Sequence, residues 1–242
     1  GIIDLCKLKT HGMMAMTAAT KNLFGTVPGL TKGAYHYRFP EETRFADMLV
    51  DLNEYFKPRL CVVDAVWAME GNGPTQGRPR KLGALLASKC PYSVDLACAK
   101  LIGLKAGDVP TLAAARRRGL IPQTAEELNV HGDLSAFVCP DFDNIRHFHA
   151  IRFYGTGQSA VHRLIGRVAR AALETRPAVR GGECVGCGRC AEVCPARAMA
   201  MRGKLPHIDR AKCIRCFCCQ EMCPKGAMKA KRPLAARILE RR

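Results

Sequence analysis

Two matching runs of cysteines near the C-terminus constrain this chain more than any other feature. Residues 184–195 read CVGCGRCAEVCP and residues 213–224 read CIRCFCCQEMCP, so both follow the pattern CxxCxxCxxxCP. The second run repeats the first at an offset of 29 residues. Four closely spaced cysteines followed by a proline are typical of a loop that wraps one [4Fe-4S] cluster. The sequence therefore predicts two clusters in one small C-terminal domain.

The spacing also predicts which cysteines act together, because the fourth cysteine of each run ligates the cluster of the other run. We expect two ligand sets: Cys184, Cys187, Cys190 and Cys223 for one cluster, and Cys213, Cys216, Cys219 and Cys194 for the second. A shifted register would use Cys218 in place of Cys219, although the spacing favours Cys219. A zinc ribbon is the alternative, but zinc sites use separated ligand pairs.

Residues 183–226 resemble the bacterial two-cluster ferredoxins, and the cysteine runs carry that resemblance. Pro195 and Pro224 turn the chain after each fourth cysteine, while Gly186 and Gly188 let backbone amides approach the sulfurs. The resemblance implies one-electron transfer with no substrate chemistry of the module's own.

The charge of the chain is strongly basic. Lys and Arg number 38 against 21 Asp and Glu, giving a formal charge of +17. Two clusters with about two negative charges each would leave about +13. The cations are spread over several segments with few aromatic neighbours, which indicates a solvated basic face and no nucleic-acid partner.

The remaining cysteine pattern indicates a reducing compartment. Five cysteines are scattered among apolar residues, as free buried thiols are: Cys6, Cys61, Cys90, Cys98 and Cys139. No long uncharged apolar run is present. We therefore expect a cytoplasmic location and no membrane insertion.

The first part of the chain alternates apolar strands with helical stretches, which predicts an α/β domain, a mixed sheet with flanking helices. The expected strands are residues 2–8, 60–68 and 82–87. The expected helices are residues 44–56, 94–102 and 111–118, capped by Thr43, Ser93 and Asp108 and stopped by Gly119. Because a buried strand starts directly after Gly1, we expect the domain to be N-terminally incomplete.

The domain boundaries follow from these patterns. We expect the α/β domain at 1–157, an amphipathic helix and linker at 158–182, the small α+β ferredoxin-like domain with two [4Fe-4S] clusters at 183–232, and a basic helix or tail at 233–242. The helix starting at 158 has an apolar face rich in alanine, which favours docking between domains over binding to a membrane surface.

The α/β domain carries three polar, glycine-rich strings: KLKTHG, TAATKNLFGTVPGLTKGAYH and DAVWAMEGNGPTQGRPRKLGALLAS. Together with the cysteine-rich tail they closely resemble the iron-sulfur proteins of domain of unknown function family 362, over residues 1 to about 140. The resemblance implies a redox protein that pairs an α/β domain with a ferredoxin module. It assigns no activity.

The same strings predict a binding site for an anion. Lys9 and His11 follow a strand, where ligands usually bind. Lys21 stands four residues after Thr17 and next to Asn22, so a cation, a hydroxyl and an amide would converge on an anionic group. The EGNGPTQG run would be a binding loop, and it matches no nucleotide fingerprint. The candidate catalytic residues are Lys9, His11, Lys21 and Glu70. The candidate substrate-binding residues are Thr17, Asn22, Asp64, Gly71, Asn72, Gly73 and Thr75.

A metal site is a further alternative for part of this set. His11, His36, Asp64 and Glu70 supply suitable ligand atoms, but their spacing matches no zinc or iron pattern. His147 and His149 alternate along a short segment and receive no role.

Two functions remain open from the sequence. In the first, the protein is an oxidoreductase that passes electrons from two [4Fe-4S] clusters to a small anionic substrate in the α/β domain, with protons from His11 or Glu70. In the second, it is a non-catalytic electron carrier or assembly subunit that docks a redox partner protein. An enclosed pocket with perturbed side chains favours the first, and an exposed apolar patch favours the second.

Overall fold

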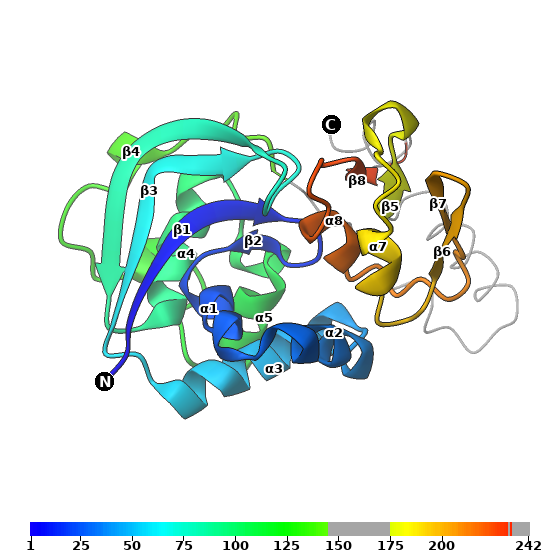
Figure 1. Ribbon diagram of the computed structural model, residues 1–242. Coiled ribbons are helices and arrows are strands. Elements are labelled where there is room, and N and C mark those ends of the chain that lie inside the picture. The colour runs from blue at the N-terminus through cyan, green and yellow to red at the C-terminus, as the bar shows by residue number, and fades with distance from the viewer. Residues whose placement is uncertain (145–174, 232, 234–242) are drawn as a thin grey trace, which may run out of the picture.

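The computed structural model of the protein describes residues 1–144, 175–231 and 233. It contains an α/β region and a small C-terminal region that lies beside it (Figure 1). The predicted amphipathic helix from residue 158, His147, His149 and the predicted tail after residue 233 lie outside the described residues.

The sheet of the α/β region has four strands in the order β2-β1-β3-β4. They are β1 (Ile3–His11), β2 (Ala15–Thr17), β3 (Leu60–Glu70) and β4 (Arg78–Ser88). β1 and β3 are parallel, whereas β2 and β4 pair antiparallel with their neighbours. The predicted mixed sheet is therefore confirmed.

The strands are longer than the sequence predicts, because they continue past the apolar residues. β1 runs to His11 because Lys9, Thr10 and His11 pair with β2. β4 begins at Arg78, which pairs with Glu70 at the end of β3. Backbone pairing with a neighbouring strand thus extends both strands through polar residues that the hydrophobic pattern leaves out.

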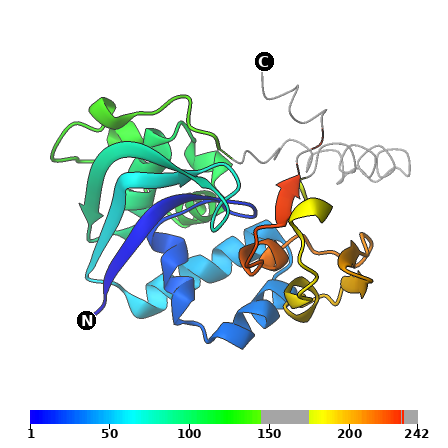
Figure 2. The same cartoon turned by 45° about the horizontal axis from the view of Figure 1, so that its top comes forward.

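The helices gather on one face of the sheet (Figures 1 and 2). α4 packs against β3 and β4, α1 contacts β1, and α3 packs on α5. The buried core between these layers includes Leu8, Phe45, Leu49, Leu101 and Leu112. The helices are α1 (Ala19–Asn22), α2 (Gly29–Arg38), α3 (Glu42–Phe56), α4 (Pro91–Leu101) and α5 (Pro110–Arg117).

Three of these helices were predicted, but their first residues differ from the prediction. Thr43 and Ser93 lie inside α3 and α4, which begin one and two residues before them. Pro91 and Pro110 open α4 and α5, where the missing N–H and the fixed φ of proline suit the first helical turn. Asp108 accepts a hydrogen bond from the Lys105 amide (2.8 Å) in the preceding 3-10 turn.

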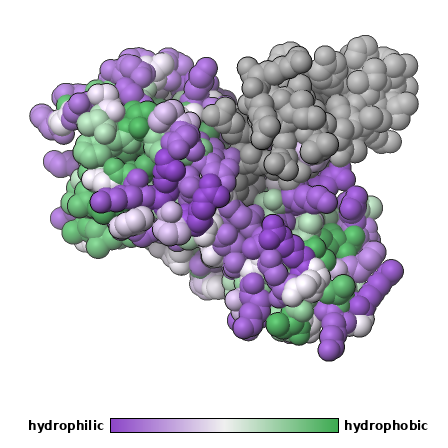
Figure 3. All heavy atoms as spheres, turned by 90° about the horizontal axis from the view of Figure 1, so that it is seen from above, coloured by the Kyte–Doolittle hydropathy of each residue, from purple (hydrophilic) through white to green (hydrophobic). Residues whose placement is uncertain are grey.

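The opposite face of the sheet carries exposed apolar side chains. Leu5 pairs with Val62, and Leu85 pairs with Asp64, so these side chains lie on one face. Leu5 and Leu85 are 70% and 68% exposed. In Figure 3, green apolar atoms gather at the left of the view, and a smaller group lies at the lower right.

The C-terminal region consists of two small antiparallel sheets and two short helices. β5 (Arg176–Val179) pairs with β8 (Met228–Lys231), and β6 (Met199–Arg202) pairs with β7 (Leu205–Ile208). The helices are α7 (Arg189–Glu192) and α8 (Cys218–Glu221). Residues 175–182, which the sequence suggests as linker, include β5, so the ferredoxin-like fold begins earlier than the prediction of residue 183. The cause is backbone pairing with β8, which the apolar pattern of so short a strand does not reveal.

The 29-residue repeat is present in the backbone as well as in the sequence. Gly186 and Gly188 have positive φ angles of 72° and 73°, and Arg215 and Phe217 have 56° and 61° at the equivalent positions of the second half. The predicted role of glycine therefore applies to the first half alone. In the second half a non-glycine residue holds the same left-handed conformation, which costs free energy and needs support from the surrounding structure.

The buried core of the α/β region gives a test of the layer arrangement. Leu49→Ala removes a side chain that is fully buried on α3, and we expect a loss of about 2–5 kcal/mol in the free energy of unfolding. Leu85→Ala on the open face is the matched control, and we expect a change within about 0.5 kcal/mol. Chemical unfolding of anaerobically purified protein, followed by circular dichroism, measures both. Equal effects of the two substitutions would contradict the arrangement.

Candidate functional site

The loop after β3 contacts the C-terminal region. Gln220 is fully buried, and its Nε2 donates hydrogen bonds to the carbonyl oxygens of Asn72 and Gly73, both at 3.0 Å. The Asn72 Oδ1 accepts a hydrogen bond from the Ala230 amide (2.9 Å), and Gln76 Nε2 donates to the Cys223 carbonyl (3.2 Å). The loop predicted to bind substrate thus docks the two regions together.

The glycines of this loop are needed for packing. A Cβ at Gly73 would overlap with the carbonyl oxygen of Thr10, so any other residue would push the loop away from β1. Gly71 has a φ of +77°, and its carbonyl accepts a hydrogen bond from Thr10 Oγ1 (2.9 Å). Gly71, Asn72, Gly73 and the neighbouring Thr75, whose hydroxyl donates to the Glu221 carbonyl (3.4 Å), therefore lie in an interface and not in a substrate pocket.

His11 lies in the same interface. Its side chain is fully buried, and its Nδ1 accepts hydrogen bonds from the Met13 and Met14 amides (3.0 and 3.1 Å). The ring proton therefore lies on Nε2, which donates to Glu221 Oε1 (2.9 Å). With both nitrogens engaged, His11 fixes the end of β1 against α8, contrary to its predicted catalytic role.

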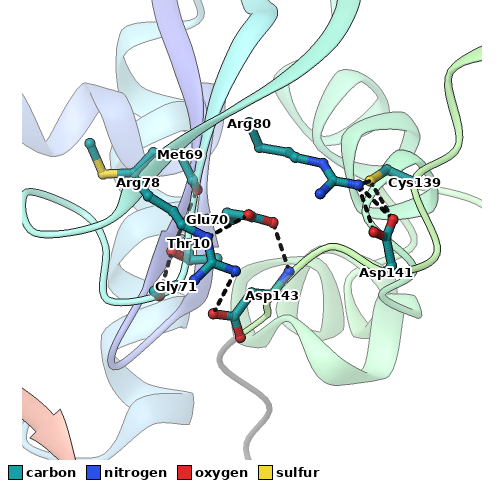
Figure 4. Close-up of polar contacts among 9 residues, drawn as sticks. All are labelled: Thr10, Met69, Glu70, Gly71, Arg78, Arg80, Cys139, Asp141 and Asp143. Carbon is teal, nitrogen blue, oxygen red and sulfur yellow. Dashed lines mark hydrogen bonds and ion pairs between the residues drawn. The ribbon is translucent and has the colours of Figure 1, made fainter.

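Glu70 also lies away from the predicted site. Its carboxylate accepts hydrogen bonds from Arg78 Nε (2.8 Å) and from the Asp143 amide (3.0 Å), as Figure 4 shows. Nearby, Arg80 contacts Asp141 (2.7 Å). These bonds tie residues 139–143 to the strands β3 and β4, so the role of Glu70 here is to hold the fold together.

Asp64 forms an ion pair on the sheet. Its Oδ2 lies 2.6 Å from Lys7 Nζ, and this hydrogen bond lowers the pKa of the carboxyl. The alternative metal site is not assembled, because His11, Asp64 and Glu70 each bond a different partner. No group of three or more His, Cys, Asp or Glu side chains in the described part of the chain lies close enough for a single metal ion.

A cleft of about 1130 Å³ separates the α/β region from the C-terminal region. Four of the predicted site residues line it: Lys9, Thr17, Lys21 and Asn22. Lys9 lies beside Thr17 because β1 and β2 pair at these residues. The Asn22 amide donates to Asp4 Oδ1 (2.6 Å), so its Oδ1 is the atom left for a ligand.

The cleft has more cations than the sequence analysis found. Lys7 and Lys32 line it from the α/β region, and Arg189 lines it from α7. Among residues 1–144 and 175–231, no carboxylate forms an ion pair with Lys9, Lys32 or Arg189. The sequence gives no signal for Arg189, because it lies about 170 residues from Lys21 and only the docking of the regions brings it near.

The position of α1 depends on a buried acid. Asp95 on α4 is 2% exposed and accepts hydrogen bonds from the Ala19 and Thr20 amides (2.8 and 3.0 Å) at the first turn of α1. Burial raises the pKa of Asp95 to about 7, although the hydrogen bonds oppose this shift. Asn53 adds a hydrogen bond to the Thr20 carbonyl (2.7 Å). These contacts set the direction in which α1 presents Lys21 to the cleft.

His36 lines the cleft and is 3% exposed. Its ring stacks on Phe45 with centroids 4.3 Å apart and meets Phe24 edge to face. Burial lowers the pKa of His36 to about 3, so the imidazole is neutral. Its Nδ1 has no hydrogen-bond partner among the described residues. The sequence analysis considered His36 for a metal site and missed this position.

Glu221 lies at the base of the cleft, where it faces His11 and the positive charge of Lys21. Burial raises the pKa of this carboxyl, but Lys21 and His11 together outweigh that effect and lower the pKa to about 2. Glu221 is therefore ionised, and it balances part of the positive charge of the cleft.

The eight expected ligand cysteines line two hollows in the C-terminal region. Cys184, Cys187, Cys190 and Cys223 line the first, and Cys194, Cys213, Cys216 and Cys219 line the second. Each hollow thus takes its fourth cysteine from the other run, in agreement with the predicted sets. The other lining residues are mostly apolar, including Val179 and Met201 in the first hollow and Ile208 in the second. Soft thiolates in a largely apolar shell fit an iron-sulfur cluster.

Two cysteines lie between the second hollow and the cleft. Cys194 and Cys218 line both. Cys218 and Cys219 both line the second hollow, so either thiol lies where a cluster ligand is expected. The first hollow shares Arg189 with the cleft but none of its cysteines.

Comparisons with known proteins match the α/β region and the C-terminal region separately. Residues 1–100 match the family described as Domain of unknown function (DUF362), and residues 183–227 match the 4Fe-4S dicluster domain. Both resemblances inferred from the sequence are thereby confirmed, and the second match supports iron-sulfur binding and an electron-transfer role. A relative described as a thylakoid-associated protein, from Synechocystis sp., is 40% identical over 126 residues. The match covers 52% of this chain and 39% of that protein, so the chain spans about two fifths of its relative.

No solved structure matches the chain. Of the helices that the structure describes, none is long and apolar enough to cross a membrane.

The contact between Gln220 and the loop after β3 can be tested directly. Gln220→Ala leaves two buried carbonyl oxygens without their donor, and we expect a loss of about 2–4 kcal/mol in local stability. The expected readout is faster hydrogen exchange at the Gly71 and Gly73 amides. Thr75→Val is the control, because it removes one long, exposed hydrogen bond. Unchanged exchange in Gln220→Ala would show that the regions dock by other contacts.

Proposed function

We propose that this protein is an iron-sulfur oxidoreductase in which two [4Fe-4S] clusters pass electrons to a small anionic substrate in the cleft between the two regions. Cys184, Cys187, Cys190 and Cys223 hold one cluster, and Cys213, Cys216, Cys219 and Cys194 hold the other. When bound, each cluster supplies one electron at a time. The observation that carries the proposal is that Cys194 lines both the second hollow and the cleft.

The residues of the cleft support binding of an anion beside Cys194. Lys9 and Lys32 supply positive charge from the α/β region, and Arg189 supplies it from the opposite wall. Charge-assisted hydrogen bonds from such groups hold carboxylate or phosphate oxygens more strongly than neutral donors do. The substrate is thus held in the cleft that Cys194 also lines.

The same geometry removes one part of the hypothesis. His11 was a candidate proton donor, but its Nε2–H bonds Glu221 and its Nδ1 accepts two backbone amides. Glu70 is bonded to Arg78 on β4 and to the Asp143 amide. In the proposed function His11 holds the two regions together, Glu70 holds the α/β region together, and Lys9 and Lys21 bind the anion.

The second candidate function is an electron carrier that docks a redox partner. The observation that favours it is the open sheet face with exposed Leu5 and Leu85. The cleft favours the enzyme, because it contains a histidine with a lowered pKa and is lined by several cations, which an electron carrier does not need.

A reducing, cytoplasmic setting belongs to the same proposal. Cys61, Cys98 and Cys139 are buried free thiols, and Cys6 and Cys90 are partly buried free thiols. Thiols kept free in this way are typical of proteins in reducing compartments.

Iron content tests the two-cluster assignment. Anaerobically purified wild-type protein is expected to hold about eight iron and about eight sulfide per chain, with spectra of two interacting clusters after reduction. Cys194→Ala is expected to lower the iron content to about half, because the second cluster loses a ligand.

Cys218→Ala is the matched control, since its side chain reaches the same hollow without being in the expected ligand set. It should retain the full iron content. Zinc in the wild-type protein, or half the expected iron, would contradict the two-cluster assignment. Loss of iron in Cys218→Ala but not in Cys219→Ala would show that Cys218, and not Cys219, is the ligand of the second cluster.

Removal of the iron tests how the C-terminal region is stabilised. Its buried core within the described residues contains Cys190, Met199, Cys219 and Met228, so half of that core consists of expected ligands. A fold with so small a core depends on its bound metal.

We expect iron removal by oxidation with a chelator to abolish hydrogen-exchange protection in residues 176–231. Protection of β3 and α4 should persist, because the α/β core contains no expected ligand. Retention of native protection in residues 176–231 after complete iron loss would contradict this dependence.

A further inference from the structure

We propose that the ligand of the cleft is a multiply charged organic anion with an apolar body, such as an aromatic or aliphatic polycarboxylate or phosphate ester. The inference rests on the proposed function and deepens it by naming the ligand class. It follows from three features of the cleft: cations on opposite walls, apolar side chains between them, and a buried imidazole whose Nδ1 has no hydrogen-bond partner among the described residues.

The cations require more than one negative charge on the ligand. Lys9, Lys21 and Lys32 belong to the α/β wall, and Arg189 belongs to the wall formed by α7. A single carboxylate contacts one wall, which leaves the opposite charge without a counterion in a partly enclosed space. Glu221 offsets the charge of Lys21 in part, since the two attract each other at the base of the cleft. An anion with two separated charges balances both walls at once.

The apolar residues require more than an inorganic ion. Phe24 and Tyr37 line the first wall, and Val193, Pro195 and Met222 line the second. The volume of about 1130 Å³ exceeds the range of about 300–1000 Å³ that holds typical organic ligands. Phosphate or pyrophosphate would leave this apolar surface in contact with water, whereas an organic body covers it.

His36 is the independent observation that a ligand completes this site. The ring packs between Phe24 and Phe45. In the described structure its buried Nδ1 has no hydrogen-bond partner, and a buried polar atom of this kind needs an explanation. His36 lines the cleft, so a ligand that shifts the ring enough to reach this nitrogen would satisfy it without adding charge.

Electrons would enter the cleft at Cys194, so the reducible part of the ligand lies near this residue. Cys194 and Pro195 line the cleft on the side of the second hollow. One charged group of the ligand binds at Lys9 and Lys21, another binds at Arg189 on the opposite wall, and the apolar body between them lies beside Pro195. The ligand therefore presents its body to the cluster ligand Cys194.

Three probes separate these contributions by calorimetry on the anaerobic holoprotein. Benzene-1,3,5-tricarboxylate combines several charges with an apolar ring, benzoate has the ring and one charge, and pyrophosphate has charge without an apolar body. We expect the tricarboxylate to bind at least about tenfold more tightly than either of the others. Equal binding of benzoate and tricarboxylate would overturn the requirement for several charges, and equal binding of pyrophosphate would overturn the requirement for an apolar body.

Substitutions locate the binding. Lys9→Gln and Lys21→Gln are each expected to weaken tricarboxylate binding about tenfold, because each removes one charge-assisted contact. His36→Phe retains the stacked ring and the fold, and is expected to weaken binding about threefold. Lys81→Gln on the exposed part of β4 is the control and should bind as the wild type does. Equal affinities in Lys9→Gln, Lys21→Gln and Lys81→Gln would place the ligand elsewhere and overturn the proposal.

The iron content and reduced spectra of the same samples distinguish two kinds of failure. Full iron and normal spectra without tricarboxylate selectivity overturn the ligand class and leave the electron relay intact. Selective binding together with the wrong iron content overturns the relay and leaves the ligand class supported.

Discussion

The contact between α8 and the loop after β3 is the interaction on which the rest of the structure depends. One buried amide, that of Gln220, satisfies two loop carbonyls, and the ring of His11 fixes the end of β1 to the acid beside it. Such buried polar contacts are directional, so they define one relative position of the two regions. Phe217, the residue that precedes α8, adds apolar burial by joining the main core of the α/β region.

The cleft is a consequence of this docking. Its two walls come from different regions, and its charge comes from lysines near the ends of β1 and on α1 and α2, together with an arginine on α7. Docking also places Cys194 at the boundary between the cleft and the second hollow.

The sequence predicted some of these features well, for reasons that differ from residue to residue. The cysteine spacing is a direct record of local geometry, and the eight predicted ligands line the two hollows in the predicted grouping. Lys9 and Lys21 were predicted because strand ends and first helical turns gather polar groups, and both line the cleft. The EGNGPTQG loop was misinterpreted, because a glycine that permits close approach to a ligand is indistinguishable in sequence from one that permits close approach to a neighbouring strand.

By itself the sequence determined the class of the fold, the repeat, and the chemistry of the cysteine sites, since each of these depends on residues that are close in the chain. Only the tertiary structure decided that His11 bonds Glu221, that Glu70 bonds Arg78, and that Arg189 and His36 line the cleft. The physical reason is that a side chain becomes part of a site through the partners that it finds or lacks. For Arg189 and His36 the surroundings are set by the packing of distant segments, which no local pattern encodes.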